Sequence, residues 1–319
     1  MFLGIEIGGT KLQLGVGAGD GVLAGLWRGA VDVAAGPEGI RRQIADAVPE
    51  LLAASGVERG RLRGVGIGFG GPVDDSTQTI IKSHQIEGWD GFPLADWISD
   101  LVGLSAALGN DADVAGLAEA LHGAGKGLSP IFYITVGSGI GGGFIIDGQI
   151  YRGVGRGAAE IGHLALNVLE RDFDFEVFEQ TVEDMASGWG IAALARQRAD
   201  KNPLLLQLAQ GRPEAIDTRL VAEAAAQGDP GARSILELAC FWLALAIRQV
   251  IALLCPRRII IGGGVSLIGE ELFFQPLRRH VAERVFKPFA GCYDIVPASL
   301  GEEVVVHGAL ALARRRLQP

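Results

Sequence analysis

The sequence has few cysteines and no excess of basic residues, and each scarcity excludes a class of protein. Its 319 residues include three cysteines, Cys240, Cys255 and Cys292, with no C-x-x-C pair and none before residue 240. This pattern excludes a disulfide scaffold and a cysteine-rich zinc site, and it favours a reducing compartment. We therefore expect no structural zinc. The formal net charge is −9, so we expect no nucleic-acid partner.

The chain also lacks a secretion signal and a long apolar run. Its N-terminus has no basic segment followed by an apolar one. The longest apolar run, from Leu238 to Ile247, is too short to span a bilayer and lies between Glu237 and Arg248. A hydrophobic content of 49% with 20% charged residues is typical of a globular protein, and the length suits two domains. We expect a cytoplasmic protein without a membrane partner.

Glycine, in contrast, is abundant, and the first glycine turn carries polar side chains. The stretch from Gly4 to Val16 reads as strand, turn and strand. Glycines allow a ligand to approach the backbone and direct N–H groups at it. The carboxylate, hydroxyl and ammonium at this turn suit the phosphates of a nucleotide and their Mg²⁺. The residues in question are Glu6, Gly8, Gly9, Thr10 and Lys11. A plain hairpin is the alternative, because short glycine motifs are common.

A second glycine turn repeats this plan between residues 131 and 146. Thr135, Gly137, Ser138 and Gly139 again lie between two apolar strands. Two such hairpins far apart in the chain predict a duplicated fold that holds one nucleotide. A first unit of three strands, a helix and a returning strand at Leu62–Phe69 indicates a ribonuclease-H-like α/β domain.

Asn110 and Asp111 follow a short predicted strand, from Leu104 to Gly109, and open a predicted amphipathic helix. Sites in open α/β sheets lie where carboxyl ends of strands meet helix N-termini. The residue types allow a second interpretation, in which one of the two is only a helix N-cap. Glu160 and His163, spaced i and i+3 after a glycine loop, would share a face of a helical turn. A structural histidine is the alternative there.

Three further expectations concern local structure. Pro49 should kink or interrupt the helix that begins near Pro37. The aromatic-containing stretch from Asp74 to Pro93 has little periodicity and is predicted to be a functional loop. The apolar helix from Asp229 to Cys255 should be buried nearly all round.

Taken together, these motifs resemble the ROK family (repressor, open-reading-frame and kinase) within the actin-like ATPase superfamily. The motifs that carry the resemblance are Glu6–Lys11, Gly70–Val73, Asn110–Asp111, Gly137–Gly142, Glu160–His163 and Ile261–Ser266. The resemblance implies two ribonuclease-H-like domains that flank a cleft. The smaller would comprise residues 1–110 with a C-terminal helix, about 301–319, packed back on it, and the larger residues 111–300. Members are commonly dimeric, which implies a homodimer.

The resemblance also implies an activity, namely transfer of a phosphate from ATP, with Mg²⁺, to a hexose hydroxyl. Asp111 corresponds to the catalytic base, and the turns at Gly8 and Gly137 correspond to phosphate-binding loops. Gly263 and Gly264 correspond to the nucleoside contact. The positions that correspond to sugar-binding groups are Gln85, Asn110, Asp111, Glu160, His163 and Glu183. A glucokinase-like enzyme acting on the 6-hydroxyl of glucose or a close relative is the leading hypothesis.

The sequence departs from the family pattern at three places. Glu6 replaces the usual aspartate of the first hairpin, so it would hold Mg²⁺ directly or through a water. Gln85 replaces the usual asparagine four residues before Trp89. The cysteine cluster for structural zinc is absent, and residues 169–180 take its place. These departures keep a non-catalytic sugar sensor as an alternative. A sugar-responsive repressor is disfavoured, because the first hairpin begins at Gly4. The sequence does not choose between hexoses or between ATP and polyphosphate.

Overall fold

The structure, a computed structural model, describes residues 1–83, 86–171 and 176–317 and divides into two compact units. Unit 1 comprises Met1–Tyr133, Gly143–Ala159 and Ala298–Pro319, and unit 2 comprises Ile134–Gly142 and Glu160–Pro297. The strands are β1 (Phe2–Ile7), β2 (Lys11–Gly17), β3 (Leu23–Ala30), β4 (Val65–Phe69), β5 (Val73–Asp74), β6 (Thr79–Ile80), β7 (Ala106–Asn110), β8 (Ile131–Val136), β9 (Ile140–Ile146), β10 (Gln149–Ile150), β11 (Ala165–Arg171), β12 (Glu176–Thr181), β13 (Arg258–Gly262) and β14 (Asp294–Pro297).

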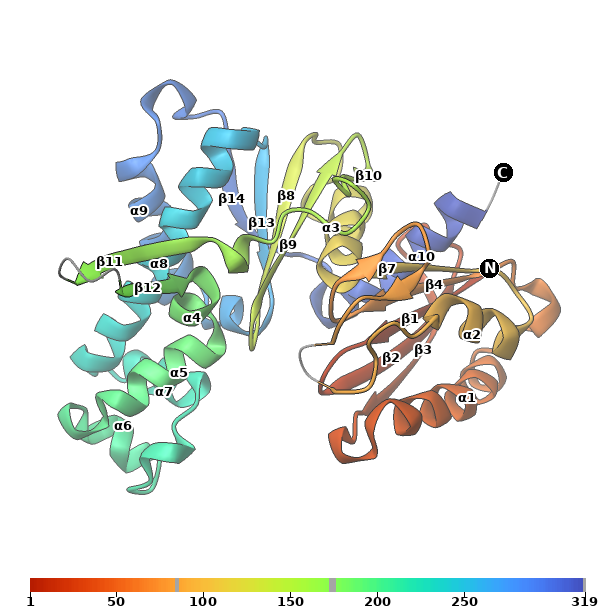
Figure 1. Cartoon of the computed structure of the whole chain (residues 1–319), viewed down its shortest axis with the longest axis horizontal. Helices are drawn as coiled ribbons and strands as arrows, with labels where there is room; N and C mark the ends of the chain where they lie inside the picture. The colour runs from red at the N-terminus through yellow and green to blue at the C-terminus, as the bar shows by residue number, and fades with distance from the viewer. Residues whose placement is uncertain (84–85, 172–175, 318–319) are drawn as a thin grey trace. The chain divides into compact units, whose positions relative to one another are not determined.

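The α-helices and the short helices used below complete the description of the elements (Figure 1). The α-helices are α1 (Gly36–Ser55), α2 (Leu94–Val102), α3 (Asp111–His122), α4 (Val182–Ala186), α5 (Gly188–Gln197), α6 (Pro203–Leu208), α7 (Thr218–Ala226), α8 (Pro230–Leu254), α9 (Gln275–Arg284) and α10 (Val304–Leu317). The short helices are η3 (Ile161–His163), η6 (Gly264–Ile268), η7 (Glu270–Phe274) and η9 (Gly301–Glu303).

The two main sheets share one strand order. The first runs β3-β2-β1-β4-β7 and the second β10-β9-β8-β13-β14. Counted along the chain, each sheet therefore reads third, second, first, fourth, fifth strand. In the first sheet β1, β2 and β3 pair antiparallel, whereas β1, β4 and β7 pair parallel. The repeated order confirms the duplicated α/β plan predicted from the two glycine hairpins.

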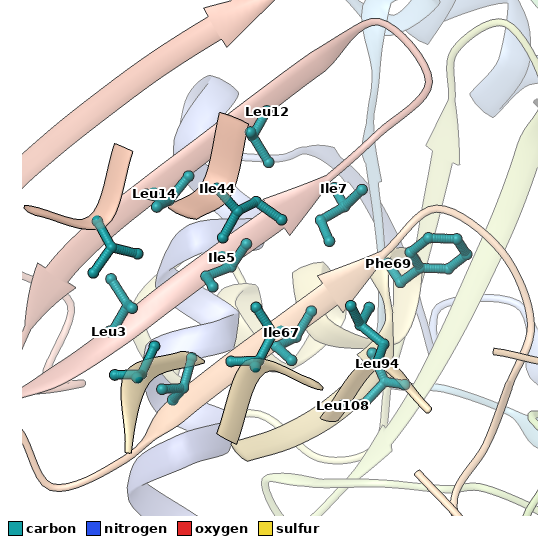
Figure 2. Packing of buried hydrophobic residues seen from close by; sticks show 14 of the residues in the cluster. Leu3, Ile5, Ile7, Leu12, Leu14, Ile44, Ile67, Phe69, Leu94 and Leu108 are labelled. Carbon is teal, nitrogen blue, oxygen red and sulfur yellow. The ribbon is translucent and has the colours of Figure 1, made fainter. Parts of the chain in front are cut away.

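One face of the first sheet forms the main core of unit 1. Leu3, Ile5 and Ile7 alternate along β1 and point to this face, where they are fully or almost fully buried. Ile44 of α1 and Leu94 of α2 belong to the same cluster (Figure 2). This is the period of two expected for a strand with one face in a core.

The other face of the sheet packs against α10, and glycines make the close approach possible. Phe2 clusters there with Val306 and Leu310 of α10. A Cβ at Gly66 would lie 1.8 Å from the carbonyl oxygen of Ala309, a distance that only glycine avoids. Glu6 belongs by its register to this face, which places its side chain near the beginning of α10.

The observed division differs from the predicted boundary after residue 110. Helix α3 packs against α10 and against β4 and β7, so residues 111–133 belong to unit 1. Residues 143–159 belong to it as well. The C-terminal helix α10 contacts β1 and β4 within the same unit.

Two local predictions, on Pro49 and on helix α8, are wrong, whereas the function predicted for the stretch 74–93 stays a prediction. Helix α1 continues through Pro49 without interruption, because the buried residues Ile44, Val48 and Leu51 hold both of its halves on the sheet. The stretch after residue 73 contains the β5–β6 hairpin, and Trp89 is fully buried between Phe69 and Phe92, in T-shaped contact with both rings. These aromatic rings therefore serve the core.

Helix α8 is less buried than its composition predicts. The most apolar stretch of this helix is 56% buried, and Leu253 is 81% exposed. Among the described residues, α8 is the one helix that is long and apolar enough to cross a membrane. A core helix of a globular protein can have the same length and composition. In this structure it packs against α4, α7 and α9.

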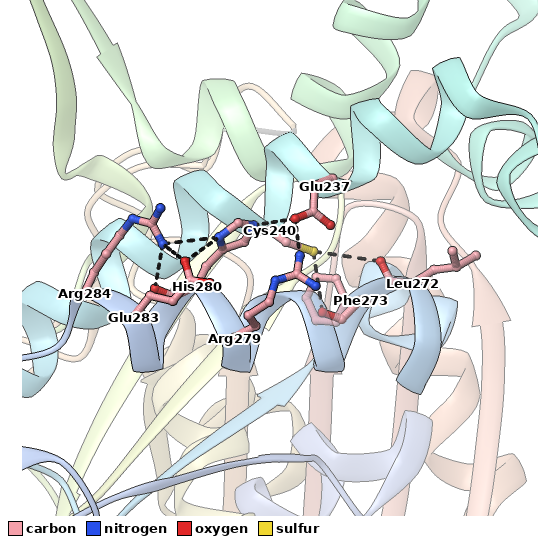
Figure 3. A network of polar contacts seen from close by, with 8 residues as sticks. All are labelled: Glu237, Cys240, Leu272, Phe273, Arg279, His280, Glu283 and Arg284. Atoms are coloured by element: carbon pink, nitrogen blue, oxygen red, sulfur yellow. Dashed lines mark hydrogen bonds and ion pairs between the residues drawn. The ribbon is translucent and has the colours of Figure 1, made fainter.

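A polar network joins α8 to the segment η7–α9 in unit 2 (Figure 3). Glu237 accepts hydrogen bonds from Arg279 and, at 2.6 Å, from Nε2 of His280. Sγ of Cys240 lies 3.5 Å from the carbonyl oxygen of Phe273. Burial raises the pKa of the Cys240 thiol to about 12, so this cysteine should be unreactive in the folded protein.

Candidate active site

The first glycine turn is a tight hairpin at the carboxyl end of β1. Ile7 pairs with Leu12, and the N–H of Gly8 donates to the carbonyl oxygen of Lys11 over 3.0 Å. Thr10 is exposed at the tip. The hairpin therefore presents backbone N–H groups and a hydroxyl at one end of the sheet, as the phosphate-binding prediction requires.

Glu6 lies below this turn and is almost completely buried, with 5% of its surface exposed. Its Oε1 lies 3.0 Å from Nζ of Lys11, which also donates to the carbonyl oxygen of Glu302 over 3.1 Å. Burial raises the pKa of Glu6 from 4.5 to about 7, although the ammonium of Lys11 lowers it. The nearby carboxylate of Asp111 contributes further to the increase.

The environment of Glu6 fits a hard cation. Its Oε2 is buried and has no hydrogen-bond partner among the residues that the structure describes. A buried oxygen without a partner is costly unless a ligand satisfies it. Mg²⁺ prefers carboxylate oxygens and water as ligands. Glu6 is therefore suited to hold the Mg²⁺ of a nucleotide, directly or through a water.

The raised pKa predicts how Glu6 affects stability without metal. The folded protein holds the Glu6 proton more tightly than the unfolded chain does, so this stabilisation is complete below pH 4.5 and lost as the pH rises through about 7. The rise in pKa from 4.5 to about 7 corresponds to about 3 kcal/mol. In EDTA, the wild type should therefore lose stability relative to Glu6→Gln as the pH rises. The difference between their free energies of unfolding, variant minus wild type, should increase by about this amount between pH 4.5 and pH 8. Urea denaturation measures it, and a difference independent of pH would contradict the raised pKa.

Asp111 is the first residue of α3, and its neighbour Asn110 serves as the N-cap. Oδ1 of Asn110 accepts from the N–H groups of Ala112 at 2.9 Å and Asp113 at 3.2 Å. The amide nitrogen of Asn110 donates to the carbonyl oxygen of Gly71. Asn110 therefore fills the capping role that the sequence assigned to one of these two residues. Oδ1 of Asp111 accepts a hydrogen bond from the N–H of Ala112 over 2.8 Å.

The register of the parallel strands brings Asp111 to the first hairpin. Ile7, Phe69 and Asn110 are paired neighbours at the ends of β1, β4 and β7. Gly70 follows β4 and donates its N–H to the carbonyl oxygen of Ile7. A Cβ at Gly70 would lie 3.5 Å from Oδ2 of Asp111 and 3.6 Å from Cα of Gly8. The carboxylate and the glycine turn thus share the carboxyl edge of the sheet, where ligands of such sheets bind.

The second glycine turn is closed and held by backbone contacts within unit 2. The N–H of Gly137 donates to the carbonyl oxygen of Gly139 over 2.9 Å. The N–H groups of Gly188 and Trp189, at the start of α5, donate to the carbonyl oxygens of Gly137 and Ser138. The sequence did not reveal this contact, because it joins segments 51 residues apart.

Two glycines of unit 2 face open space. A Cβ at Gly137 or at Gly264 would have no atom within 4 Å, and neither residue has a positive φ. Packing therefore does not explain why these positions are glycine, whereas a ligand close to the backbone does. Gly263, by contrast, is required sterically, since its Cβ would lie 2.5 Å from the carbonyl oxygen of Val136. That contact brings Gly263 and Gly264 beside the hairpin.

The turn between Glu160 and His163 and the side chain of Glu183 both lie against Ile140 in unit 2. Glu160 precedes η3, and both Glu160 and His163 are exposed. Between them, Gly162 lies against the carbonyl oxygen of Ile140, 2.1 Å from where its Cβ would be. The N–H of Ile140 donates to Oε2 of Glu183 over 2.7 Å. Two carboxylates and an imidazole are groups that can hydrogen-bond the hydroxyls of a sugar.

The predicted residues divide between the two units. Glu6, the first hairpin, Asn110 and Asp111 belong to unit 1, whereas the second hairpin, Gly263, Gly264 and the predicted sugar ligands Glu160, His163 and Glu183 belong to unit 2. Gln85 lies outside the described residues. The sequence also missed the carbonyl oxygen of Glu302, which binds both Lys11 and the side chain of Gln13.

The prediction of no structural zinc stays open to test. Residues 165–171 and 176–181, near the place of the family's cysteine cluster, form the β11–β12 hairpin. Among the described residues no group of three histidine, cysteine or acidic side chains could hold a metal ion. Because thiolates dominate structural zinc sites, metal analysis of the purified protein should find far less than one zinc per chain. About one tightly bound zinc per chain would contradict the prediction.

Comparisons with known proteins place these motifs in a family. The sequence profile of the ROK family matches residues 2–316. Glucokinase of Thermotoga maritima is 32% identical over 99% of this chain and 98% of its own length. The structure of a ROK family glucokinase from Streptomyces griseus in complex with glucose and AMPPNP is 32% identical, has a TM-score of 0.79, and covers 98% of this chain and 99% of that chain.

A transcriptional regulator has a similar fold. A ROK family transcriptional regulator, a homologue of the Escherichia coli MLC protein, has a TM-score of 0.82 at 21% identity and covers 98% of this chain and 77% of that chain. At this identity the likeness shows the fold alone. The glucokinase relatives, together with the glycine hairpins and Asp111, support a sugar kinase. The chain belongs to the ROK family, whose two-domain actin-like ATPase fold it shares.

Proposed function

We propose that this protein transfers the terminal phosphate of ATP to a hexose hydroxyl, the 6-hydroxyl of glucose or a close relative. The observation that carries the proposal is the position of Asp111. It lies beside the first glycine hairpin, at the carboxyl edge of the sheet, while Asn110 provides the N-cap of α3. Because Asn110 provides the cap, the helix does not require the Asp111 carboxylate for that purpose.

Asp111 would act as the general base. A sugar hydroxyl is a weak nucleophile, so a carboxylate within hydrogen-bond distance orients it and accepts its proton as the bond to phosphorus forms. The N-terminus of α3 favours the ionised carboxylate. Asp111 should therefore be able to accept the proton at neutral pH.

The glycine hairpins would hold the nucleotide. Gly8, Gly9, Thr10 and Lys11 of unit 1, with Gly137, Ser138 and Gly139 of unit 2, offer N–H groups, hydroxyls and one ammonium to the phosphates. Gly263 and Gly264 would contact the nucleoside, which agrees with the open space beside Gly264. Bound Mg²⁺, held at Glu6, would neutralise phosphate charge.

The sugar would be bound by the polar groups that the family motifs assign to it. Asn110 and Asp111 of unit 1 and Glu160, His163 and Glu183 of unit 2 supply donors and acceptors for several hydroxyls. Gln85 is proposed as a further ligand from its position in the family motif. The glucose and AMPPNP bound by the Streptomyces griseus relative support this assignment of substrate class.

The proposal also covers the compartment and the oligomeric state of the enzyme. Three free cysteines and the need for ATP favour the cytoplasm. A homodimer is proposed from the family alone.

The test is an assay of ADP release with Mg²⁺-ATP and a panel of hexoses that includes glucose, mannose, fructose and N-acetylglucosamine. We expect turnover with glucose or one close relative, and polyphosphate in place of ATP tests the choice of donor. Binding of a hexose without turnover on any member of the panel would contradict the proposal and identify a non-catalytic sensor. The replacement of the usual aspartate by the buried Glu6 is the observation that keeps this alternative relevant.

A further inference from the structure

The carboxylate of Glu183 is attached to the second glycine hairpin. Its Oε2 accepts a hydrogen bond of 2.7 Å from the N–H of Ile140, the residue that follows the turn. The same oxygen would lie 2.4 Å from a Cβ at Gly139, so glycine is needed for this approach. A hydrogen bond to a charged acceptor is shorter and stronger than one between neutral groups.

The segment that contains Glu183 makes three hydrogen bonds to the hairpin. Beyond the bond to Ile140, the N–H of Gly188 donates to Gly137 over 2.8 Å, and the N–H of Trp189 donates to Ser138 over 3.1 Å. Residues 183–189 therefore bind every residue of the turn except Gly139, against which the Glu183 carboxylate packs directly.

The segment itself is rigidly capped. At the start of α4, Oγ1 of Thr181 accepts from the N–H of Asp184, and the Asp184 carboxylate accepts from the N–H and hydroxyl of Thr181. The side chain of Ser187 caps α5 through the N–H of Gly190. Such reciprocal caps fix a helix start, so the backbone that carries Glu183 is well positioned to constrain the hairpin.

We propose that Glu183 is a positioning residue for the nucleotide: it orders the Gly137–Gly139 turn before ATP binds and links that turn to the sugar site. The inference rests on the proposed function. Oε2 accepts from the N–H of Ile140, and Oε1 would meet a sugar hydroxyl. Occupation of the sugar site would thus reinforce the same carboxylate that holds the phosphate-binding turn.

The conformational freedom of glycine is the energetic reason why ordering this turn would favour nucleotide binding. A turn with glycines at two of its three positions loses much conformational entropy when it is ordered around phosphates. A carboxylate that fixes the turn in the free protein removes part of this cost from the binding step. Loss of one hydrogen bond to a charged group corresponds to about tenfold or more in affinity.

The experiment measures binding of Mg²⁺-AMPPNP by calorimetry in the absence of any sugar. Glu183→Ala should raise Kd about tenfold or more. Glu183→Gln should restore most of the affinity, because its amide oxygen can accept the Ile140 N–H. Gly139→Ala, whose methyl group would displace the carboxylate, should raise Kd similarly, and the double variant should lose little more than either single one. Hydrogen exchange of the peptide covering residues 137–140 should be faster in Glu183→Ala, independent of activity.

The matched control is Glu223→Ala, which removes an exposed carboxylate of α7 in the same unit. Its Kd for Mg²⁺-AMPPNP without sugar should stay at the wild-type value. If Glu183→Ala also keeps the wild-type Kd and the wild-type exchange rate, the positioning role is wrong, while the kinase proposal stands. If the wild type itself binds no Mg²⁺-AMPPNP, the proposed function fails and this inference fails with it.

Discussion

Replacement of Asp111 by asparagine is expected to lower kcat by roughly 10²–10⁴-fold. The amide keeps the size of the side chain and can still accept from the N–H of Ala112, but it cannot take a proton at neutral pH. Because Asn110 caps α3 through two N–H groups, the melting temperature should change little. KM for the sugar should also change little, since the loss concerns the transition state.

Asp217→Asn is the matched control for this variant. Asp217 is the N-cap of α7 in unit 2, where its carboxylate accepts from the N–H of Leu220 over 2.8 Å. Asparagine is an equally good N-cap, so this exchange at a helix start should leave both kcat and stability unchanged. Steady-state kinetics with saturating ATP and sugar compare the two variants. An Asp111→Asn enzyme with wild-type turnover would remove Asp111 from the mechanism.

Truncation of the predicted sugar ligands should raise KM for the sugar more than KM for ATP. Glu160→Ala or His163→Ala is expected to raise KM for the sugar by roughly 10–100-fold, with a much smaller effect on KM for ATP. A polar site that loses a hydrogen-bonding group leaves the partner hydroxyl unpaired. The Gly162 contact with Ile140 is made by the backbone, so these truncations should leave the turn in place.

Glu223→Ala, on the exposed side of α7, controls for loss of a carboxylate from unit 2 and should leave both KM values unchanged. Kinetics with each substrate varied at a saturating level of the other make the comparison. Equal increases in both KM values for Glu160→Ala and His163→Ala, or none, would place these residues outside the sugar site.

The parts of the fold that the sequence predicted depend on local patterns. The alternation of Leu3, Ile5 and Ile7 and the glycines that follow them are read directly from neighbouring residues, and the hairpin at Gly8 was predicted in this way. The repeat of the pattern at Gly137 was enough to predict the duplicated sheet.

The parts that the sequence did not predict depend on contacts between distant segments. Pro49 was expected to disturb α1, but the buried face of that helix outweighs the loss of one backbone hydrogen bond. Trp89 was assigned to a functional loop because its stretch has little periodicity, and its contact with the ring of Phe69, 20 residues earlier, cannot be read from local pattern. The link from Glu183 to Ile140 spans 43 residues. Burial of Glu6 likewise results from the return of the chain at Glu302.

The most direct test of the central claim is to identify the product by phosphorus NMR. The wild-type protein is incubated with Mg²⁺-ATP and the hexose that gives the highest rate of ADP release, with glucose as the first choice. We expect the γ-phosphate signal of ATP to disappear, with ADP and a hexose phosphomonoester formed in equal amounts and the phosphorus coupled to the two protons on carbon six. Complete retention of ATP in the presence of a bound hexose would contradict the account.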